Sequence, residues 1–294
     1  MRVAVTGATG LLGRSVLPSL IEAGHDVVAL VRTPERAVLA QSMGADAQVG
    51  SLFDVGAFAE LLDGFDVVCN LASHVPVNYA AAMPWVRRGS DALRTEGVRR
   101  ILEAARKAGV RRVVQESASY LYADAGDDWI NERSTLCINE VTEPISVGES
   151  LVQEFTCCSR TGVVLRFGAL VEAQTSPQVR QRVGRVMALG APDGWAHVVH
   201  ASDVGPAVLA ALDAPSGVYN VGAVPVRRSA LAEGYAQAGG RRRRLAPALA
   251  RLSGQRAEPL TRSLRVSSSA FHDHTGWEPR HAEFDASWLM AGSA

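Results

Sequence analysis

Lysine is nearly absent from this chain of 294 residues, because all but one of its 30 basic side chains, Lys107, are arginines. Acidic side chains also number 30, so the net charge is zero and gives no reason to expect nucleic acid or a membrane surface as a partner. No apolar run reaches the roughly 18 residues of a membrane-spanning helix, and the first residues follow the pattern of a strand, which differs from that of a signal peptide. We therefore expect a soluble, cytoplasmic protein.

Cysteine is scarce as well. The four cysteines are too few and too scattered for a disulfide framework, and none has metal-ligand spacing with histidine. The composition, 47% hydrophobic and 20% charged, is ordinary for a globular protein and argues against disorder. We expect one large α/β domain or two smaller ones, with no metal site.

A glycine-rich segment joins the first predicted strand, Arg2–Thr6, to the first predicted helix, Leu12–Ala23. Gly7 permits a tight turn, Gly10 lets the backbone approach a pyrophosphate, and Gly13 lets the helix lie close to the sheet. The N–H groups and the dipole at the start of the helix then hold the phosphates. A glycine-rich turn without a ligand is the alternative, but the order of strand, glycines and helix favours a dinucleotide site. Its predicted residues are Gly7, Thr9, Gly10, Leu11 and Leu12.

The next predicted strand, Asp26–Val31, ends without an acidic residue. An acid about 20 residues past the glycines would bind the ribose 2′-hydroxyl of NAD. Here Arg32 follows the strand and Arg36 stands one helical turn later, and a guanidinium can bind a 2′-phosphate with two hydrogen bonds. We therefore predict NADP(H) as the cofactor and Arg32 as a binding residue. In the alternative, the cofactor is NAD and Arg32 is a solvated loop residue.

Strands and helices continue to alternate along the chain, which predicts an α/β protein with a doubly wound parallel sheet, the Rossmann fold. Ligands of such sheets lie at the carboxyl ends of the strands. The further strands are predicted at Ala47–Gly50, Asp66–Leu71, Arg111–Ser117 and Val163–Phe167, and the further helices at Pro34–Gly44, Val55–Leu62, Pro84–Ala108 and Gly148–Arg160.

Over nearly its whole length the chain resembles the extended or atypical short-chain dehydrogenase/reductase superfamily, the NAD-dependent epimerase/dehydratases. TGATGLLG resembles the superfamily's glycine motif, CNLAS the end of its fourth strand, and GVYNVG a late segment. The resemblance implies a Rossmann core in residues 1–170, and a part 171–294 that completes the sheet and forms a substrate lobe. It also implies the cofactor contacts Asp54 at the adenine, Leu71, Ala72 and Ser73 at the nicotinamide ribose, and Ser117 at the active-site strand.

The chain departs from that superfamily at its catalytic pair, a tyrosine followed four residues later by a lysine. In the superfamily the lysine lowers the pKa of the tyrosine, which exchanges a proton with the substrate oxygen while hydride moves. Here Val147 and Leu151 stand at the matching positions, and Lys107 lies on the preceding predicted helix. The standard proton relay is therefore absent.

Other polar side chains near the strand ends are candidates for the chemistry. For catalysis these are Ser119, Tyr120 and Glu149. Glu149 is predicted at a helix N-terminus, where the dipole favours a carboxylate, so a simple first-turn acid is the alternative. His74 and Tyr122 are candidates for substrate contacts, with a loop histidine and a packed tyrosine as the alternatives.

Three functions are compatible with these residues. The first is an NADP(H)-dependent oxidoreductase with a non-standard acid, and the second is a redox-neutral isomerase, dehydratase or cyclase; both would act on a small specialised metabolite or a sugar-like substrate. The third is a dinucleotide-binding sensor without turnover, similar to NmrA-like regulators. The superfamily commonly dimerises through two helices, so a homodimer through Pro84–Ala108 and Gly148–Arg160 is a further expectation.

Overall fold

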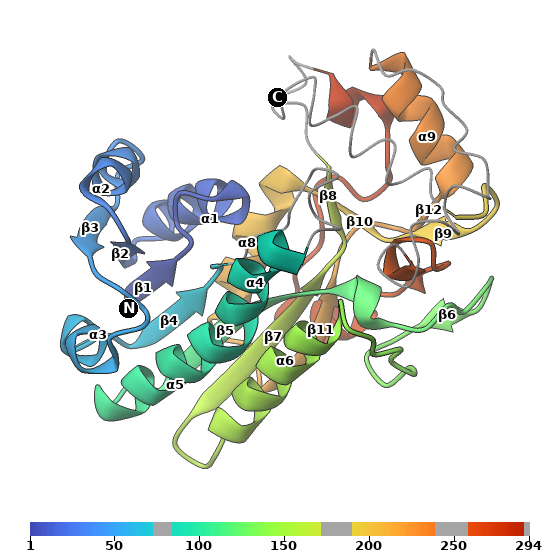
Figure 1. Ribbon diagram of the computed structural model, residues 1–294. Helices are drawn as coiled ribbons and strands as arrows, with labels where there is room; N and C mark the ends of the chain where they lie inside the picture. Colours follow the sequence, from blue (N-terminus) through green and yellow to red (C-terminus); the bar gives the residue numbers. More distant parts are fainter. Residues whose placement is uncertain (73–83, 172–189, 239–257, 291–294) are drawn as a thin grey trace.

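The computed structural model describes residues 1–72, 84–171, 190–238 and 258–290 (Figure 1). Its centre is a seven-stranded sheet. The seven strands are β1 (Arg2–Thr6), β2 (Asp26–Val31), β3 (Asp46–Val49), β4 (Val67–Asn70), β5 (Arg112–Ala118), β7 (Thr161–Phe167) and β11 (Gly217–Val221).

The strand order is β11-β7-β5-β4-β1-β2-β3, and every neighbouring pair is parallel. The predicted doubly wound Rossmann sheet is therefore confirmed. The order reverses between β1 and β4, and the crevice outside the carboxyl ends of strands at such a point is where these folds bind ligands.

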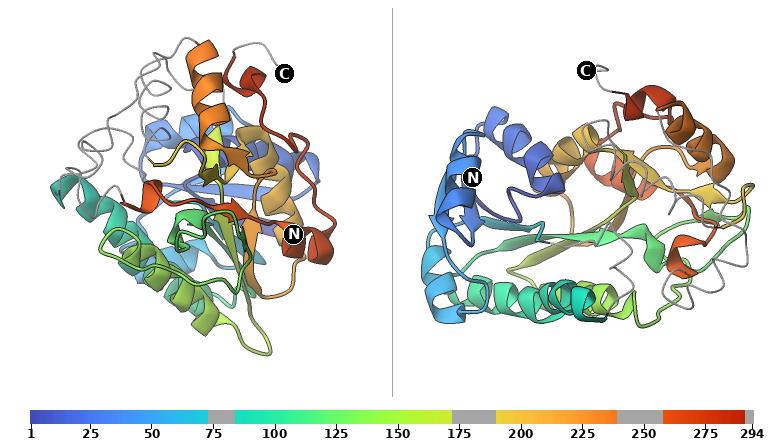
Figure 2. Two further views of the ribbon diagram at one scale, coloured as in Figure 1. Left: turned by 90° about the vertical axis from the view of Figure 1, so that its right-hand side faces the viewer. Right: turned by 45° about the horizontal axis from the view of Figure 1, so that its top comes forward.

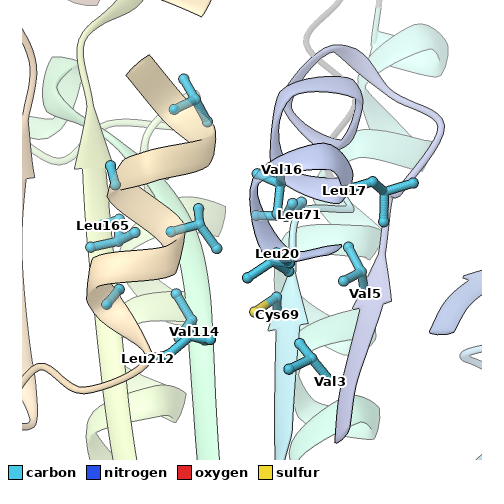
Figure 3. Packing of buried hydrophobic residues seen from close by; sticks show 14 of the residues in the cluster. Val3, Val5, Val16, Leu17, Leu20, Cys69, Leu71, Val114, Leu165 and Leu212 are labelled. Carbon is cyan, nitrogen blue, oxygen red and sulfur yellow. The ribbon is translucent and has the colours of Figure 1, made fainter. Parts of the chain in front are cut away.

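Helices cover both faces of the sheet, as the right-hand view of Figure 2 shows. One face carries α1 (Leu11–Glu22), α2 (Pro34–Gln41) and α8 (Ala201–Ala211), and the other carries α3 (Val55–Leu61), α5 (Val98–Lys107) and α6 (Glu143–Phe155). In Figure 3, Val16, Leu17 and Leu20 of α1 pack over β1 and β4. These side chains are fully buried, and each contributes about 1.5–3 kcal/mol of hydrophobic stabilisation.

The long helix predicted at Pro84–Ala108 is interrupted. It consists of α4 (Pro84–Ala92), a π-helical turn η2 (Leu93–Gly97) and α5. Gly148 of α6 lies against this turn, because a Cβ at that position would be only 2.7 Å from the carbonyl oxygen of Arg94. Such π turns are often found at functional sites.

The helix predicted at Gly148–Arg160 begins earlier than expected. α6 starts at Glu143 with Pro144 in its first turn, a position that suits proline because no backbone N–H is needed there. Glu149 therefore lies in the middle of the helix, and its predicted place at an N-terminus is wrong.

The rest of the described chain forms short elements beside the sheet. Three two-stranded pairs are present: β8 (Ala169–Val171) with β10 (Val198–His200), β9 (Trp195–Ala196) with β12 (Val226–Arg227), and β6 (Trp129–Ile130) with β13 (Arg265–Val266). The helical elements are α9 (Arg228–Gln237), α11 (Ser269–Thr275), η3 (Ser119–Leu121), η5 (Glu258–Leu260) and η6 (Ala286–Leu289). The predicted division at residue 170 stays a prediction. β11, from the second part, completes the sheet, and α8 packs on the same face of the sheet as α1.

The first of the two helices expected in a dimer interface packs its apolar residues within the subunit. Val98, Ile101, Leu102 and Ala105 of α5 are buried against the sheet and α6. The homodimer stays a prediction without support from this helix face. Among the described residues, no helix combines the length and the apolar character needed to cross a bilayer.

Candidate functional site

The glycine loop after β1 has the geometry expected of a phosphate-binding turn. Gly7 has φ +68°, and a Cβ there would collide with the carbonyl group of Leu71 at the end of β4. A Cβ at Gly13 would collide with the backbone of Ala8, so α1 lies close to the loop. The N–H of Gly10 donates to the carbonyl oxygen of Gly7 at 2.9 Å, which closes the turn. Larger side chains do not fit at Gly7 and Gly13.

The start of α1 presents backbone donors. Gly10 is its N-cap and supplies no side-chain hydrogen bond, so the first N–H groups are available to an anion. Leu11 follows with 45% of its side chain exposed, and Leu12 is half-buried. Thr9 is buried, and its Oγ1 accepts a hydrogen bond from Nη1 of Arg36 at 2.7 Å.

Positive charge flanks this loop at the end of β2. Arg32 is exposed just beyond the strand, and Arg36 reaches from α2 to the loop at Thr9. Asp54, which follows β3 in the chain, is the N-cap of α3, and its Oδ1 accepts from the N–H of Ala57 at 3.1 Å. One oxygen of the residue predicted to contact adenine is thus already used in capping.

A buried chain of hydrogen bonds connects the carboxyl ends of β1 and β4 to the middle of β5. Thr6 donates to Asn70 at 2.5 Å, Asn70 donates to Gln115 at 2.7 Å, and Gln115 donates to the carbonyl oxygen of Glu116 at 2.8 Å. Asn70 also accepts from the N–H of Ala72 at 3.3 Å, so it fixes the start of the segment that follows β4. These contacts hold the ends of β1 and β4 in place beside β5, at the switch point of the sheet.

The predicted residues beyond β4 are only partly described. Leu71 is buried and Ala72 is half-buried. Ser73 and His74, predicted to contact the nicotinamide ribose and the substrate, lie outside the described residues.

A second buried network joins β5, α6 and β7. Arg166 donates from Nε to Glu149 Oε1 at 2.9 Å and from Nη2 to Oε2 at 2.6 Å. Ser117, opposite Arg166 in the strand register, donates to Glu149 Oε1 at 2.5 Å. The side chains of Arg166 and Glu149 are only 4% and 5% exposed. Both oxygens of this predicted catalytic carboxylate are therefore occupied by hydrogen bonds to neighbouring side chains.

Tyr122 extends this network to β11. Its hydroxyl donates to Oδ1 of Asn220 at 2.7 Å and accepts from Nη1 of Arg166 at 2.8 Å. The residue is fully buried, and its burial raises the pKa of the phenol. The expectation that Tyr122 contacts substrate is wrong, because its hydroxyl is enclosed by protein groups.

Sequence reasoning missed a third polar group, Arg94 with Glu116. β4 ends opposite Gln115, so Glu116 extends beyond its neighbouring strand, and its Oε1 lies 3.1 Å from Nη2 of Arg94 in the π-helical turn. Both side chains are less than a tenth exposed. The acidic residue Glu116 near the carboxyl end of a predicted strand was the one available signal, whereas the π-helical turn has no such signal in the sequence.

Tyr120 lies in the electric field of that ion pair. It is half-buried in the turn after β5, and burial raises the pKa of its hydroxyl. The positive charge of Arg94 opposes this increase, while Glu116 adds to it. Ser119, the preceding residue, is 3% exposed. Of the three predicted catalytic residues, Tyr120 is the one whose side chain lies near the Arg94–Glu116 ion pair, and its backbone carbonyl oxygen accepts from Nη1 of Arg262 at 2.9 Å.

The positions of the missing catalytic pair are apolar in their surroundings as well. Leu151 belongs to the hydrophobic cluster between the sheet and α3, α5 and α6, and Val147 packs against that cluster. Among the described residues, no group of three potential metal ligands comes together.

A family model described as NAD(P)H-binding matches residues 7–215. The chain belongs to this NAD(P)H-binding family. The fold agrees with solved relatives: a UDP-glucose-4-epimerase from Stenotrophomonas maltophila with bound NAD and formylated UDP-arabinopyranose has a TM-score of 0.75 and 20% identity, covering 98% of this chain and 95% of that one. The expected resemblance to the epimerase/dehydratase fold is thereby confirmed.

Curated relatives match over shorter stretches. A 4-hydroxy-2-methyl-3-oxo-4-farnesyl-3,4-dihydroquinoline-1-oxide ketoreductase of Stigmatella aurantiaca is 40% identical over 73 residues, 25% of this chain and 22% of that protein. A photosystem II assembly factor of Synechocystis is 34% identical over 73 residues, covering the same 25% and 22%. The first relatives matched are covered over only 15% to 19% of their length.

The family membership confirms the predicted cofactor as NAD(P)(H), and the glycine loop fits it. Gly7 and Gly13 leave no room for a Cβ, and the first N–H groups of α1 suit a pyrophosphate. The choice between NADP and NAD stays a prediction, which rests on Arg32.

Proposed function

We propose that this family member is an NADP(H)-dependent reductase of a small carbonyl substrate, with Tyr120 as the proton donor. The observation that carries the proposal is the position of Tyr120 just beyond β5, in the field of the Arg94–Glu116 ion pair. Ligands of this fold lie at the carboxyl ends of the strands, where Tyr120 lies as well. Bound NADPH supplies the hydride; the groups discussed below belong to the chain itself.

The protonation state of Tyr120 favours reduction over oxidation. Burial raises the pKa of its hydroxyl, so Tyr120 holds its proton at neutral pH and can donate it to a developing alkoxide, as a weaker acid than an unperturbed tyrosine. The reverse reaction needs a tyrosinate, which burial disfavours. In the superfamily's tyrosine–lysine pair, the tyrosine can donate a proton during reduction and accept one during oxidation. In this proposal, Val147 and Leu151 in place of that pair leave Tyr120 suited to reduction.

The remaining network residues have positioning roles in this proposal. Arg94 keeps a permanent positive charge beside the tyrosine, because a guanidinium does not lose its proton in proteins. Glu149 and Arg166 fix α6 against β5 and β7, and Ser117 is held by them. Ser119 is the second candidate for a direct hydrogen bond to the substrate oxygen.

The preference for NADP(H) rests on charge at the end of β2. Arg32 and Arg36 can bind a 2′-phosphate, and no carboxylate stands where NAD-specific enzymes bind the ribose hydroxyls. Arg36 is already fixed near the loop by its hydrogen bond to Thr9.

A small ketone or a sugar-like carbonyl compound is the proposed substrate class. In its support, a solved relative of the same fold holds a UDP-sugar and a partial relative is named a ketoreductase. The test is NADPH oxidation, followed by absorbance, with a panel of small ketones, quinones and UDP-sugars.

Two variants make this test specific. Tyr120→Phe should lower kcat by about 10²–10⁴, the usual contribution of general acid catalysis, and leave NADPH affinity unchanged. Tyr219→Phe removes a comparable hydroxyl, which donates to the carbonyl oxygen of Pro215 away from the site, and should leave kcat within about 2-fold. Equal rates for wild type and Tyr120→Phe on a turned-over substrate would refute the role of Tyr120.

A binding protein without turnover is the second candidate function. The apolar surroundings of Val147 and Leu151 favour it, as does the partial similarity to an assembly factor. Introducing the tyrosine–lysine pair by Val147→Tyr with Leu151→Lys would destabilise the fold, because the lysine would enter a hydrophobic cluster. NADPH binding without turnover on the whole panel, and with no effect of Tyr120→Phe, would favour this candidate.

A further inference from the structure

A basic cavity lies at the opposite end of the sheet from the glycine loop. It has a volume of about 590 Å³. Its lining residues belong to the end of α5, the start of β5 and the turn between α6 and β7, and Figure 1 labels these helices and strands. These are the amino ends of β5 and β7, whereas the cofactor loop is at the carboxyl end of β1. The volume is in the range of small-molecule sites.

Four arginines line this cavity, Arg106, Arg111, Arg112 and Arg160, and none of its described lining residues is acidic. The guanidinium carbons of Arg106 and Arg160 are each 5.4 Å from the ring centre of Phe155, so the two charges are within about 11 Å of each other. Both side chains line the same cavity, so an anion bound there would be attracted by both charges.

The arginines differ in how much of their charge is available. Nη1 of Arg112 donates to the carbonyl oxygens of Ala211 and Ala214, at the end of α8, so this side chain is partly used. Nε of Arg160 donates to the carbonyl oxygen of Phe155, which fixes the guanidinium in place. Arg106 and Arg111 are exposed at the rim of the cavity.

We propose that this cavity binds a small multivalent anion of the phosphate class. Guanidinium groups recognise phosphate oxygens with paired, charge-assisted hydrogen bonds. The Ser159 hydroxyl, which also lines the cavity, adds an uncharged donor. This site is separate from the cofactor site and does not depend on the proposed reaction.

A cysteine in the cavity wall provides a local probe. Cys157 and Arg160 pair through their backbones in a tight turn, and this turn presents Cys158 to the cavity. Cys158 is exposed, so it is open to alkylation. The neighbouring Cys157 does not line the cavity, and hydrogen bonds with Ser159 together with the charge of Arg160 lower its pKa to about 7. Because this thiol would also be alkylated, all measurements use the Cys157→Ser variant, which leaves Cys158 as the one thiol in the turn.

The experiment measures the rate of iodoacetamide alkylation at Cys158 by peptide mass spectrometry, with saturating NADPH to occupy the pyrophosphate site of the glycine loop. Inorganic pyrophosphate should slow alkylation of Cys158 at least 5-fold, while Cys137 serves as the internal control that it should not protect. Chloride at equal ionic strength should give no protection.

Charge variants decide whether the arginines are responsible. Arg106→Gln with Arg111→Gln should raise the pyrophosphate concentration for half-protection by about 10-fold or more. Arg99→Gln removes an exposed charge that is also on α5 but does not line the cavity, and it should change the pyrophosphate concentration for half-protection less than about 2-fold. No protection at 10 mM pyrophosphate, equal protection by chloride, or unchanged protection in the double variant would overturn the proposal.

Discussion

The buried ion pair between Glu149 and Arg166 gives a prediction about stability that separates a structural role from a catalytic one. In Glu149→Gln, an amide N–H₂ group replaces the oxygen that now accepts from Arg166 Nη2 at 2.6 Å, and the buried guanidinium loses its counter-charge. Removing one partner of such a pair costs about 3–5 kcal/mol, because the other charge stays buried and unpaired. We expect this range for the loss in free energy of unfolding.

The assay is urea unfolding of wild type and Glu149→Gln, together with a double-mutant cycle of Glu149→Leu, Arg166→Met and the double variant that carries both changes. The double variant should be less destabilised than the sum of the two single changes, since apolar replacement of both charges leaves neither one unpaired. Lys107→Met serves as the control, because its pair with Glu103 at 3.0 Å is about half exposed and should contribute less than about 0.5 kcal/mol. Single-variant losses below about 1 kcal/mol, with simple additivity in the double variant, would refute the buried pairing.

Three further changes test the glycine loop, the preference for NADP(H) and the effect of a buried histidine on stability. Gly10→Asp should abolish NADPH binding, measured by fluorescence titration, without unfolding the chain, because it puts a negative charge where the pyrophosphate lies; unchanged affinity would contradict the assignment of the loop. Arg32→Ala should weaken NADPH by about 10- to 100-fold and leave NADH nearly unchanged, and tighter binding of NADH by wild type would show that the NADP preference is wrong. His197 is 3% exposed, and burial lowers its pKa to about 3 from 6.5. As the pH falls, His197 is protonated in the unfolded chain near pH 6.5 but in the folded protein only near pH 3. The free energy of unfolding should therefore decrease between pH 6.5 and pH 3, by up to about 1.4 kcal/mol per pH unit. A His197→Leu variant whose unfolding free energy falls as steeply as that of wild type between pH 6 and pH 4 would contradict this reasoning.

Much of the fold could be predicted because its signals are local. The predicted ends of the strands lie within two residues of the observed ones, since β-branched runs bounded by glycine or charged residues indicate buried parallel strands. The glycine loop could be predicted for the same reason, because Gly7 and Gly13 are needed by contacts with segments that the motif itself implies.

The contacts of the candidate site could not be predicted because they join residues far apart in the chain. Glu149 is paired with a residue of β7 and Tyr122 with one of β11, contacts that depend on how the sheet assembles. Arg94 is turned toward Glu116 by a π-helical turn, which composition and periodicity do not reveal. The start of α6 was missed because Pro144, a helix-initiating residue in this position, was overlooked as a signal.

In the proposed site, buried ion pairs arrange charge near the strand ends without a tyrosine–lysine pair at Val147 and Leu151. Positive charge near the strand ends now comes from Arg94 and Arg166, on two elements other than the one carrying the lost pair. Because each arginine is balanced by a buried carboxylate, neither leaves an excess of charge that would strongly lower the pKa of Tyr120. A lone lysine would have done so. In the proposed site, Tyr120 holds its proton across the neutral range and can donate it to a developing alkoxide, although Val147 and Leu151 are apolar.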